Sequence, residues 1–401
     1  MMNPLTAMHT EESQTITYKN PTLKANKNSS KPIKIALVSC GLGHVKRGVE
    51  ASTARWFEAL KEHEAVDVRL FSGGEYLGAK QIDNIPRDSL LKTILYPFTC
   101  LNGRRTWEFC YGVEQITFAA GFGSTLLSWQ PDIVWTKETP FAHILAFTRP
   151  FFNLKYKLIF SNGCGFEPST YAHFDYIQHL HRESFEKAKQ FGISPDKMTV
   201  LPNLVRIPKI DKTKEESRNY FGYKPDDWVI ACAAAWNCYH KRIDYLIKEV
   251  AKIKDEKVKL LLCGQPETDT AYLKKMAENL LPNRVQWHTL PADRVPLALQ
   301  ASDIFVLPSL EELFGGVVVE AMMLGIPVIS HQTSANRQFT SLVLPTYDLS
   351  APNNLTQYLI DARNSPTEKQ KLDHLANTVQ NIYSEESLCQ QFVDMSLAAL
   401  Q

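Results

Sequence analysis

The sequence predicts an α/β fold in which two Rossmann-like domains face each other across a cleft. Three observations support this fold class: a length of 401 residues, two series of short apolar runs separated by helical patterns, and a charged, proline-containing break between the two series. With 44% apolar residues, the chain has enough material for two cores of ordinary size.

The first domain is expected to occupy residues 33–204. Its first apolar run, 33–39, is of the buried-strand type, and 49–60 has helical spacing after a glycine-bearing loop. This order is the first unit of a parallel sheet. Residues 1–32 lack apolar periodicity and are expected to form a disordered tail. Further strands are expected at 66–71, 132–136, 156–161 and 198–201.

The second domain is expected to occupy residues 205–384. This domain begins within the stretch 202–225, which combines prolines with a charged run and has no apolar alternation. Such a stretch suits a linker that includes a short helix. After it, apolar runs and helical patterns alternate again. Strands are expected at 228–235, 258–263, 285–288, 303–308 and 327–330.

The charge balance limits the partners that the whole surface can attract. The 44 Lys and Arg residues nearly match the 43 Asp and Glu residues, so the net charge of +1 gives no general attraction to nucleic acid or anionic lipid. Any anionic ligand must therefore meet a local site. The eight cysteines never form a C-x-x-C pair, which favours reduced core residues over disulfides or zinc ligands.

The sequence also favours a cytoplasmic protein. No run approaches the roughly 18 apolar residues needed to span a bilayer, and the N-terminus is polar. Peripheral membrane contact is a further expectation, because Lys155 and Lys157 stand beside Phe151 and Phe152.

The most informative stretch runs from residue 303 to residue 329. It places Glu312 and Glu320 eight positions apart, with Phe314-Gly315-Gly316-Val317 between them, and continues with Glu-Ala-Met and Gly-Ile-Pro-Val-Ile. This pattern resembles the donor site of retaining glycosyltransferases of family 4, the glycosyl transferases group 1, which have the GT-B fold. The resemblance implies that Glu312 is catalytic and holds sugar hydroxyls, and that Glu320 holds ribose hydroxyls. It also implies a C-terminal helix, 385–401, that crosses back to the N-terminal domain.

Elementary chemistry supports a donor site in the same stretch. Phe314, Gly315, Gly316 and Val317 lie between a predicted strand and an apolar helix, so backbone N–H groups and the positive end of the helix would face a diphosphate. An isolated pair of glutamates would more often be ordinary surface carboxylates. The flanking motif favours the site.

Residues 235–247 resemble a second family segment, Arg-x4-Lys-Gly-x-Asp-x-Leu-Ile. Lys241 falls on the lysine that neutralises the leaving diphosphate, which makes it a catalytic and donor-binding candidate. The family arginine aligns with Trp236, and the family glycine aligns with Arg242. Arg242 and His240 are therefore candidates for a second positive group; a weaker site, or a solvated helix start, is the alternative. The sequence shows no Asp-x-Asp pair and no metal-ligand cluster, so we expect no metal and no cofactor.

The first domain carries weaker signals. Gly43 lies in the loop Cys-Gly-Leu-Gly-His that connects a strand to a helix, where glycines permit a tight turn and close approach to a ligand, so Gly43 is a donor-binding candidate. The G-x-G-x4-G spacing does not match a dinucleotide fingerprint. Asn162 replaces a family histidine and, with His143, is an acceptor-binding candidate; His44 is another nearby histidine, and a lone histidine is more often structural. The stretches 102–109 and 164–168 are expected to be loops, either of an acceptor pocket or of an irregular surface.

The resulting hypothesis is a retaining transfer of a hexosyl group from a nucleotide diphosphate sugar to a saccharide or lipid-linked acceptor, in polysaccharide or glycoconjugate synthesis. Retention rests on the family resemblance. Two alternatives stay open: an inactive subunit that binds a sugar nucleotide, and an epimerase or phosphorylase with the same twin-domain fold. Nucleic acid is not expected as a partner.

Overall fold

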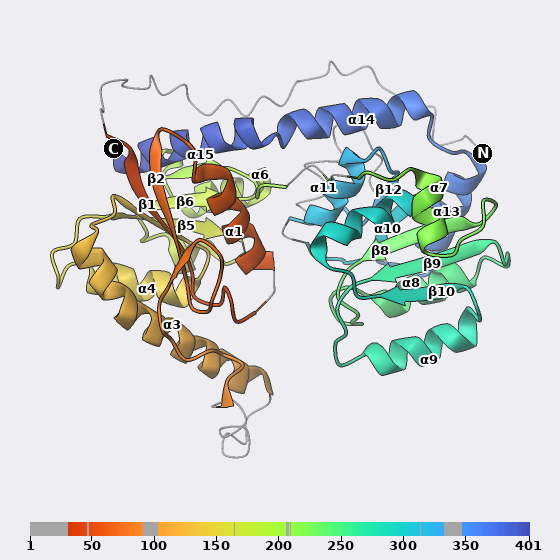
Figure 1. The fold of residues 1–401 in the computed structure, drawn as a ribbon, viewed down its shortest axis with the longest axis horizontal. Coiled ribbons are helices and arrows are strands. Elements are labelled where there is room, and N and C mark those ends of the chain that lie inside the picture. The colour runs from red at the N-terminus through yellow and green to blue at the C-terminus, as the bar shows by residue number, and fades with distance from the viewer. Residues whose placement is uncertain are drawn as a thin grey trace.

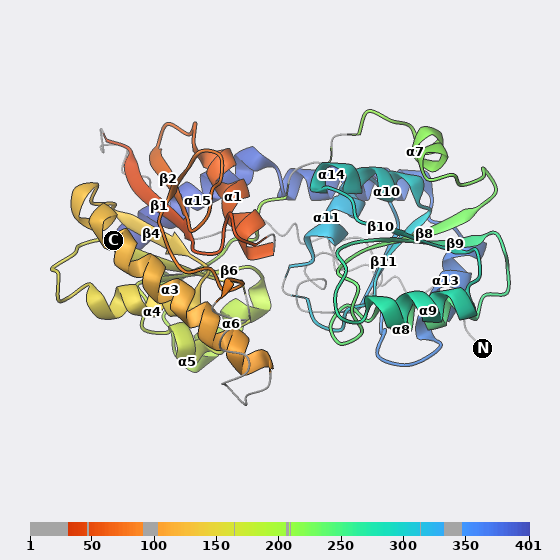
Figure 2. The ribbon, with the colours of Figure 1, turned by 60° about the horizontal axis from the view of Figure 1, so that its bottom comes forward.

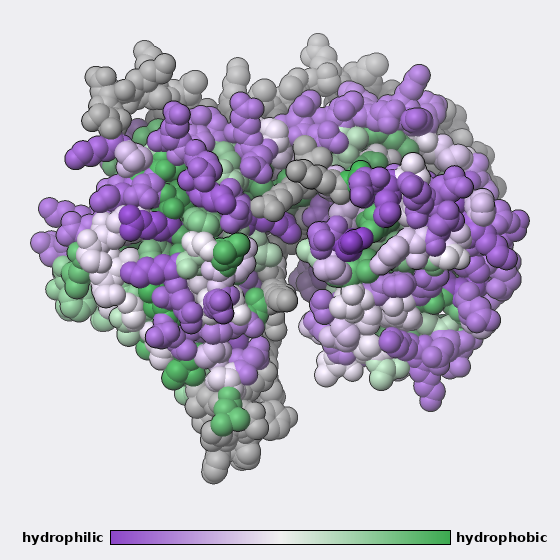
Figure 3. Space-filling view, viewed as in Figure 1, coloured by the Kyte–Doolittle hydropathy of each residue, from purple (hydrophilic) through white to green (hydrophobic). Residues whose placement is uncertain are grey.

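The computed structural model describes residues 31–45, 48–90, 103–163, 165–205, 208, 210–312, 314–332 and 347–401. They form two α/β lobes of similar size, and the space-filling view shows an open cleft between the lobes (Figures 1 and 3). The predicted fold class is confirmed. The tail expected over residues 1–32 lies outside the described residues, except for Lys31 and Pro32.

The first domain is built on a seven-stranded parallel sheet with the order β3-β2-β1-β4-β5-β6-β7. Every apolar run predicted as a strand in this domain is a strand, with ends that differ by at most one residue. The bounds are β1 (Ile33–Ser39), β2 (Val66–Ser72), β3 (Ala79–Gln81), β4 (Ile133–Thr136), β5 (Lys157–Asn162), β6 (Tyr176–His179) and β7 (Met198–Val200).

Two strands of this sheet were not predicted. β3 is only three residues long and mostly exposed, so it has no apolar signature. β6 contains the polar pair Gln178-His179, yet it is fully buried. Gln178 is satisfied there because its amide accepts from the Trp135 indole N–H (2.8 Å) and donates to the Leu201 carbonyl (2.8 Å). Tertiary hydrogen bonds of this kind leave no trace in a hydrophobic pattern.

Helices cover both faces of the first sheet (Figures 1 and 2). The prediction of a loop at 102–109 is wrong, because the chain is helical from Gly103 onward. This long helix turns an apolar face inward, and Phe118 and Phe122 pack against Phe141. Polar and charged residues near its start had concealed that periodicity. The helices are α1 (Gly48–Leu60), α3 (Gly103–Ser128), α4 (Thr139–Thr148), α5 (Pro168–Tyr171) and α6 (Arg182–Phe191).

The second domain contains a five-stranded parallel sheet with the order β10-β9-β8-β11-β12. All five predicted strands are present, namely β8 (Trp228–Ala233), β9 (Val258–Cys263), β10 (Val285–His288), β11 (Ile304–Leu307) and β12 (Val328–Ser330). The helices are α7 (Lys214–Tyr220), α8 (Ile243–Ala251), α9 (Thr270–Leu280), α10 (Val295–Ala301), α11 (Gly316–Met323) and α13 (Asn354–Asn364).

The last two helices, α14 (Lys369–Ile382) and α15 (Glu385–Leu400), run one after the other across both lobes (Figures 1 and 2). α14 packs against α11, and the Gln380 amide donates to the Met323 carbonyl (2.8 Å). α15 packs on the first domain, where the Phe392 ring lies 4.9 Å from that of Trp56 and 6.1 Å from that of Trp135. These contacts join residues of both lobes in one hydrophobic cluster.

Candidate active site

The main candidate site lies where β8 and β11 end. These neighbouring strands form the place at which the strand order of the second sheet reverses, and in open α/β sheets such a crevice at the carboxyl ends binds ligands. Residues 236–242 follow β8 and residues 308–316 follow β11, so the two segments singled out by the motifs meet at this edge.

Three consecutive residues bridge these two segments. The His240 imidazole lies 3.1 Å from the Glu311 carbonyl oxygen, Lys241 forms an ion pair with Glu312, and the Arg242 guanidinium donates to the Pro308 carbonyl (3.1 Å). The structure thus brings Lys241 and Glu312 into direct contact. Their side chains remain 19% and 10% exposed, so a ligand can reach them.

Asn237 supports Lys241 and was missed by the sequence reasoning. Its side-chain oxygen accepts from the backbone N–H groups of His240 (3.1 Å) and Lys241 (2.7 Å), and its amide donates to Glu267 (2.9 Å). Asn237 is buried. An asparagine in the connection between a strand and a helix is a known turn-former, so the signal was present in the sequence.

Arg242 has a structural role in the described contacts. Its backbone is left-handed (φ 51°), a conformation that glycine adopts without strain, which explains how the family glycine can align here. Its guanidinium donates to the Leu349 carbonyl (2.7 Å) as well as to Pro308, and it lies 4.1 Å from the Tyr245 ring centroid. Arg242 therefore braces the start of α8 against the segment after residue 347.

Trp236 lies in the core of the second domain. Its side chain is 3% exposed and its ring meets Trp287 edge to face at 5.0 Å. Gly264 is required beside it, because an added Cβ would lie 1.8 Å from the Ala234 carbonyl oxygen and 3.0 Å from the Trp236 indole nitrogen. Trp236 supplies no positive charge where the family has an arginine.

The start of α11 supplies the glycine pair of the motif. Gly315 is left-handed (φ 62°) and precedes the first helical residue, Gly316. Phe314 packs with its ring 6.1 Å from that of Tyr383, and Val317 is partly buried against the same hydrophobic cluster. Backbone N–H groups at such a helix start favour an anion.

Glu320 lies within α11 and faces the first domain. Burial raises the pKa of its carboxyl group, and the positive charge of Arg55 on α1 acts in the opposite direction. α1 and α11 belong to different lobes, so Glu320 is electrostatically coupled to the first domain.

The candidates in the first domain are engaged within that domain. Gly43 is left-handed (φ 90°), and an added Cβ would lie 2.4 Å from the Gly74 carbonyl carbon. Asn162 is buried at the end of β5, where its side chain accepts from the Phe166 N–H (3.2 Å). His143 lies 3.1 Å from His173, ring nitrogen to ring nitrogen; burial, and then the neighbouring His173, lowers the pKa of His143.

Other expectations fall partly outside the described residues. Of the expected loop 164–168, Cys164 is not described, and α5 begins at Pro168. The six cysteines within the described ranges are all free. In the same part of the chain, no three His, Cys, Asp or Glu side chains are grouped so that they could hold a metal ion, and no helix is long and apolar enough to cross a membrane.

The fold and the site together define a GT-B protein whose motif-bearing edge lies in the second domain. Residues 227–361 match the model of the family Glycosyl transferases group 1. The match covers the whole second sheet and the site at its carboxyl edge.

Relatives align over the same part of the chain. The O-antigen biosynthesis glycosyltransferase WclY of Escherichia coli is 26% identical over 139 residues, 35% of this chain and 38% of that protein. The 2-deoxystreptamine glucosyltransferase of Streptomyces kanamyceticus is 34% identical over 176 residues, 42% of this chain and 45% of that protein. The matched regions therefore span less than half of each of these two relatives.

Solved structures match the fold of the whole chain. The structure of Anabaena Alr3699/HepE in complex with UDP and glucose superposes with a TM-score of 0.68 at 16% identity, over 90% of this chain and 98% of that one. The sucrose-phosphate synthase of Thermosynechococcus elongatus gives 0.71 at 15% identity, over 90% and 97%. At this level of identity the likeness is one of fold.

Proposed function

We propose that the protein is a retaining glycosyltransferase that moves a hexosyl group from a nucleotide diphosphate sugar to a saccharide or lipid-linked acceptor, in polysaccharide or glycoconjugate synthesis. The ion pair between Lys241 and Glu312 carries this proposal, because it joins two motif residues at the carboxyl edge of the second sheet. The group 1 match over residues 227–361 and relatives such as WclY support it.

In the proposed site, each charge has a separate task. The ammonium group of Lys241 and the N–H groups at Gly315 and Gly316 hold the diphosphate, while Glu312 binds sugar hydroxyls and Glu320 binds the ribose. Lys241 and Glu312 now neutralise each other, so the donor must take Lys241 away from Glu312. Arg242 acts as a brace for this site.

The proposed chemistry is a front-face substitution. The acceptor hydroxyl attacks the anomeric carbon from the side of the leaving group, and the bond between that carbon and the phosphate oxygen breaks. The diphosphate keeps the electron pair, and one of its oxygens takes the hydroxyl proton. Fixed positive groups stabilise the charge that builds on the diphosphate without a metal ion.

Calorimetric titration with UDP-, GDP- and ADP-sugars tests the donor site. We expect one donor to bind, and Lys241→Ala and Glu320→Ala to weaken it about tenfold or more. Lys248→Ala is the matched control, because Lys248 lies on α8 of the same domain and pairs with Asp244 at the surface. If no donor binds the wild type, or if the Lys248 variant loses as much affinity as the others, the proposed donor site is wrong.

The burial of Trp236 favours a second candidate, a subunit that binds a sugar nucleotide without turning it over. The site then lacks the cation that the family arginine provides, and charge on the leaving diphosphate is less well stabilised. Donor consumption separates the two candidates. Transfer of sugar to an acceptor in a cell extract excludes the inactive subunit, and release of free nucleotide diphosphate with no acceptor present indicates an epimerase.

Peripheral membrane contact is proposed for the α4 end of the first domain. Phe147, Phe151 and Phe152 are 71%, 73% and 64% exposed there, with Lys155 exposed beside them. Hydrophobic atoms gather along this lower left edge in Figure 3. Aromatic tips next to lysines suit an anionic lipid surface. Co-sedimentation with phosphatidylglycerol vesicles should be lost in the triple Phe→Ser variant and kept in Phe191→Ser; equal sedimentation of both variants would exclude this surface.

A further inference from the structure

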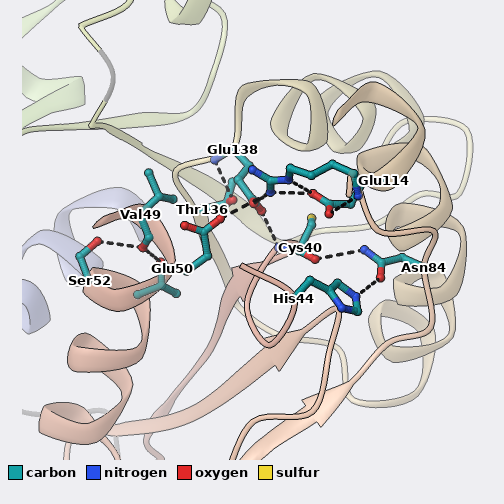
Figure 4. Close-up of polar contacts among 11 residues, drawn as sticks. Cys40, His44, Val49, Glu50, Ser52, Asn84, Glu114, Thr136 and Glu138 are labelled. Atoms are coloured by element: carbon teal, nitrogen blue, oxygen red, sulfur yellow. Dashed lines mark hydrogen bonds and ion pairs between the residues drawn. The ribbon is translucent and has the colours of Figure 1, made fainter. Parts of the chain in front are cut away.

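Four buried, charged side chains meet at the carboxyl edge of the first sheet. Glu50 comes from α1, Arg87 from the segment after β3, Glu114 from α3 and Glu138 from the connection between β4 and α4. All four are at most 5% exposed. Figure 4 shows the three glutamates and the polar contacts around them. We call them the Arg87 cluster; none of its members was a predicted site residue.

Arg87 and Glu114 form the anchor of the cluster. The guanidinium meets one Glu114 oxygen through Nε (2.7 Å) and Nη2 (2.6 Å), and the other oxygen accepts from the Arg87 backbone N–H (3.0 Å). The carboxyl groups of Glu50 and Glu138 lie farther from the guanidinium, with oxygens 3.5 Å and 3.6 Å from Arg87 Nη2. Three carboxyl groups therefore share one guanidinium in a dry environment.

Such an arrangement of buried charges is not expected to stabilise the folded state. Buried charges lose their hydration, and a buried ion pair is often replaceable by apolar residues with no loss of stability. Burial, opposed by the Cys40 N–H and by Arg87, raises the pKa of Glu138 from 4.5 to about 7, so the excess charge is disfavoured. The cluster must be explained by what it positions.

Glu138 holds the end of β1. One of its oxygens accepts from the Cys40 N–H at 2.6 Å, at the point where β1 gives way to the turn 41–44 that leads towards α1. Asn84 adds a second contact, since its amide donates to the Cys40 carbonyl (3.0 Å) while its oxygen lies 2.9 Å from the His44 ring (Figure 4). The turn is thus fixed from both sides.

The turn packs closely against the cluster. A Cβ added to Gly41 would lie 2.3 Å from Arg87 Nη2 and 2.7 Å from Glu50 Oε1. Gly43, at the far end of the turn, abuts Gly74 just as closely. No side chain would fit at either glycine, so the backbone of the turn lies directly against the Arg87 cluster at one end and against Gly74 at the other.

The place of this turn points to ligand binding. β1 pairs with β2 on one side and with β4 on the other, so the strand order of the first sheet reverses between β1 and β4. This is the same topological position that the Lys241 and Glu312 pair occupies in the second sheet. α1, which follows the turn, is also the helix whose Arg55 acts on Glu320 across the lobes.

We propose that Glu138 and Arg87 are positioning residues, which hold the turn 41–44 in place as the part of the first domain that meets the substrates. This rests on the proposed function, in which the first domain must be aligned with the donor held by the second. The ionised Glu138 carboxylate accepts the hydrogen bond from the Cys40 N–H more strongly than the protonated carboxyl group does. Among the described residues, the groups that act on Glu138 are Cys40 next to β1, Arg87 from the segment after β3 and Glu50 from α1, and Glu114 from α3 holds Arg87.

Hydrogen exchange of the intact protein, read by mass spectrometry, tests the positioning directly. In Glu138→Gln we expect protection factors over residues 40–45 to fall about tenfold at pH 8, because a neutral amide accepts the Cys40 N–H less strongly than a carboxylate. In the wild type, the same loss should appear as the pH is lowered through about 7. In Arg87→Lys we expect the same fall in protection over residues 40–45. The protection should still depend on pH, because Glu138 is unchanged in this variant.

Asp175→Asn is the matched control. It breaks the ion pair with Arg149, which lies at the opposite edge of the same sheet beside the start of β5. Equal protection of residues 40–45 in the wild type and in Glu138→Gln, with both proteins folded by near-ultraviolet circular dichroism, would overturn the positioning role. So would an equal loss in Asp175→Asn.

Turnover tests the functional half of the inference. With the donor found by titration, Glu138→Gln should lower kcat about tenfold or more while donor affinity changes by less than about twofold, because the charged groups proposed to hold the donor, Lys241, Glu312 and Glu320, lie in the other domain. Unchanged kcat in a variant whose turn has lost protection would overturn this half. If the wild type itself shows no transfer, the proposed function fails, and the exchange experiment still tests the positioning.

Discussion

The carboxyl edges of the two sheets use charge in opposite ways. In the second domain, Lys241 and Glu312 form one balanced pair that solvent can reach, with exposures of 19% and 10%. In the first domain, Arg87 is 5% exposed and shares its charge among three buried carboxyl groups. An accessible pair can exchange a partner for a ligand, whereas a buried cluster can act only on the backbone that it holds.

The largest difference between the two edges should appear in the pH dependence of stability. Because the pKa of Glu138 is raised from 4.5 to about 7, the folded state holds a proton that the unfolded state has lost between these values. The stabilisation is therefore complete below about pH 4.5 and disappears as the pH rises through 7; the gap corresponds to roughly 3 kcal/mol. Urea unfolding of the wild type and of Glu138→Gln at pH 5 and pH 8 measures it.

In that experiment the free energy of unfolding of Glu138→Gln, relative to the wild type, should increase between pH 5 and pH 8. Glu312→Gln serves as the control from the other edge, because Glu312 keeps access to water and has Lys241 beside it. Parallel pH profiles for the wild type and Glu138→Gln would show that the Arg87 cluster does not strain the first domain.

A smaller effect is expected from the brace at the second edge. Arg242→Gly keeps a backbone that suits φ 51° but removes the guanidinium from the Pro308 and Leu349 carbonyls. We expect donor affinity to fall about tenfold, as Glu312 and the start of α11 lose support. Asn283→Gly, which changes another left-handed residue of the same domain (φ 58°), should leave the affinity unchanged. Calorimetry with the donor checks both, and equal affinities of all three proteins would contradict the brace.

The sequence predicted the two edges unequally, for a physical reason. The strands of both sheets follow from apolar runs, and the motif residues after β8 and β11 stand in short segments next to those runs. The members of the Arg87 cluster come from positions 50, 87, 114 and 138, and only the packing of four elements brings them together. β6 and the start of α3 were missed for similar reasons, since buried Gln178 and His179 obscure a strand and charged residues obscure the first turns of a helix.

Local motifs do not by themselves determine two further roles. Arg242 is basic and lies next to Lys241, so it was a candidate for a phosphate ligand; the structure shows its guanidinium donating to two carbonyl groups. Asn162 stays a predicted acceptor-binding residue, and in the structure its side-chain oxygen accepts from the Phe166 N–H. A residue type indicates which bonds are available, but the tertiary structure determines which of them are made.

The most direct test of the account compares the binding of a free nucleoside diphosphate in Lys241→Met and Glu312→Gln. If the ion pair opens to release Lys241 for the diphosphate, Lys241→Met should weaken binding of the diphosphate about tenfold or more, and Glu312→Gln should bind it as tightly as the wild type or more tightly. Equal affinity of Lys241→Met and the wild type would contradict a donor site at this edge of the second sheet.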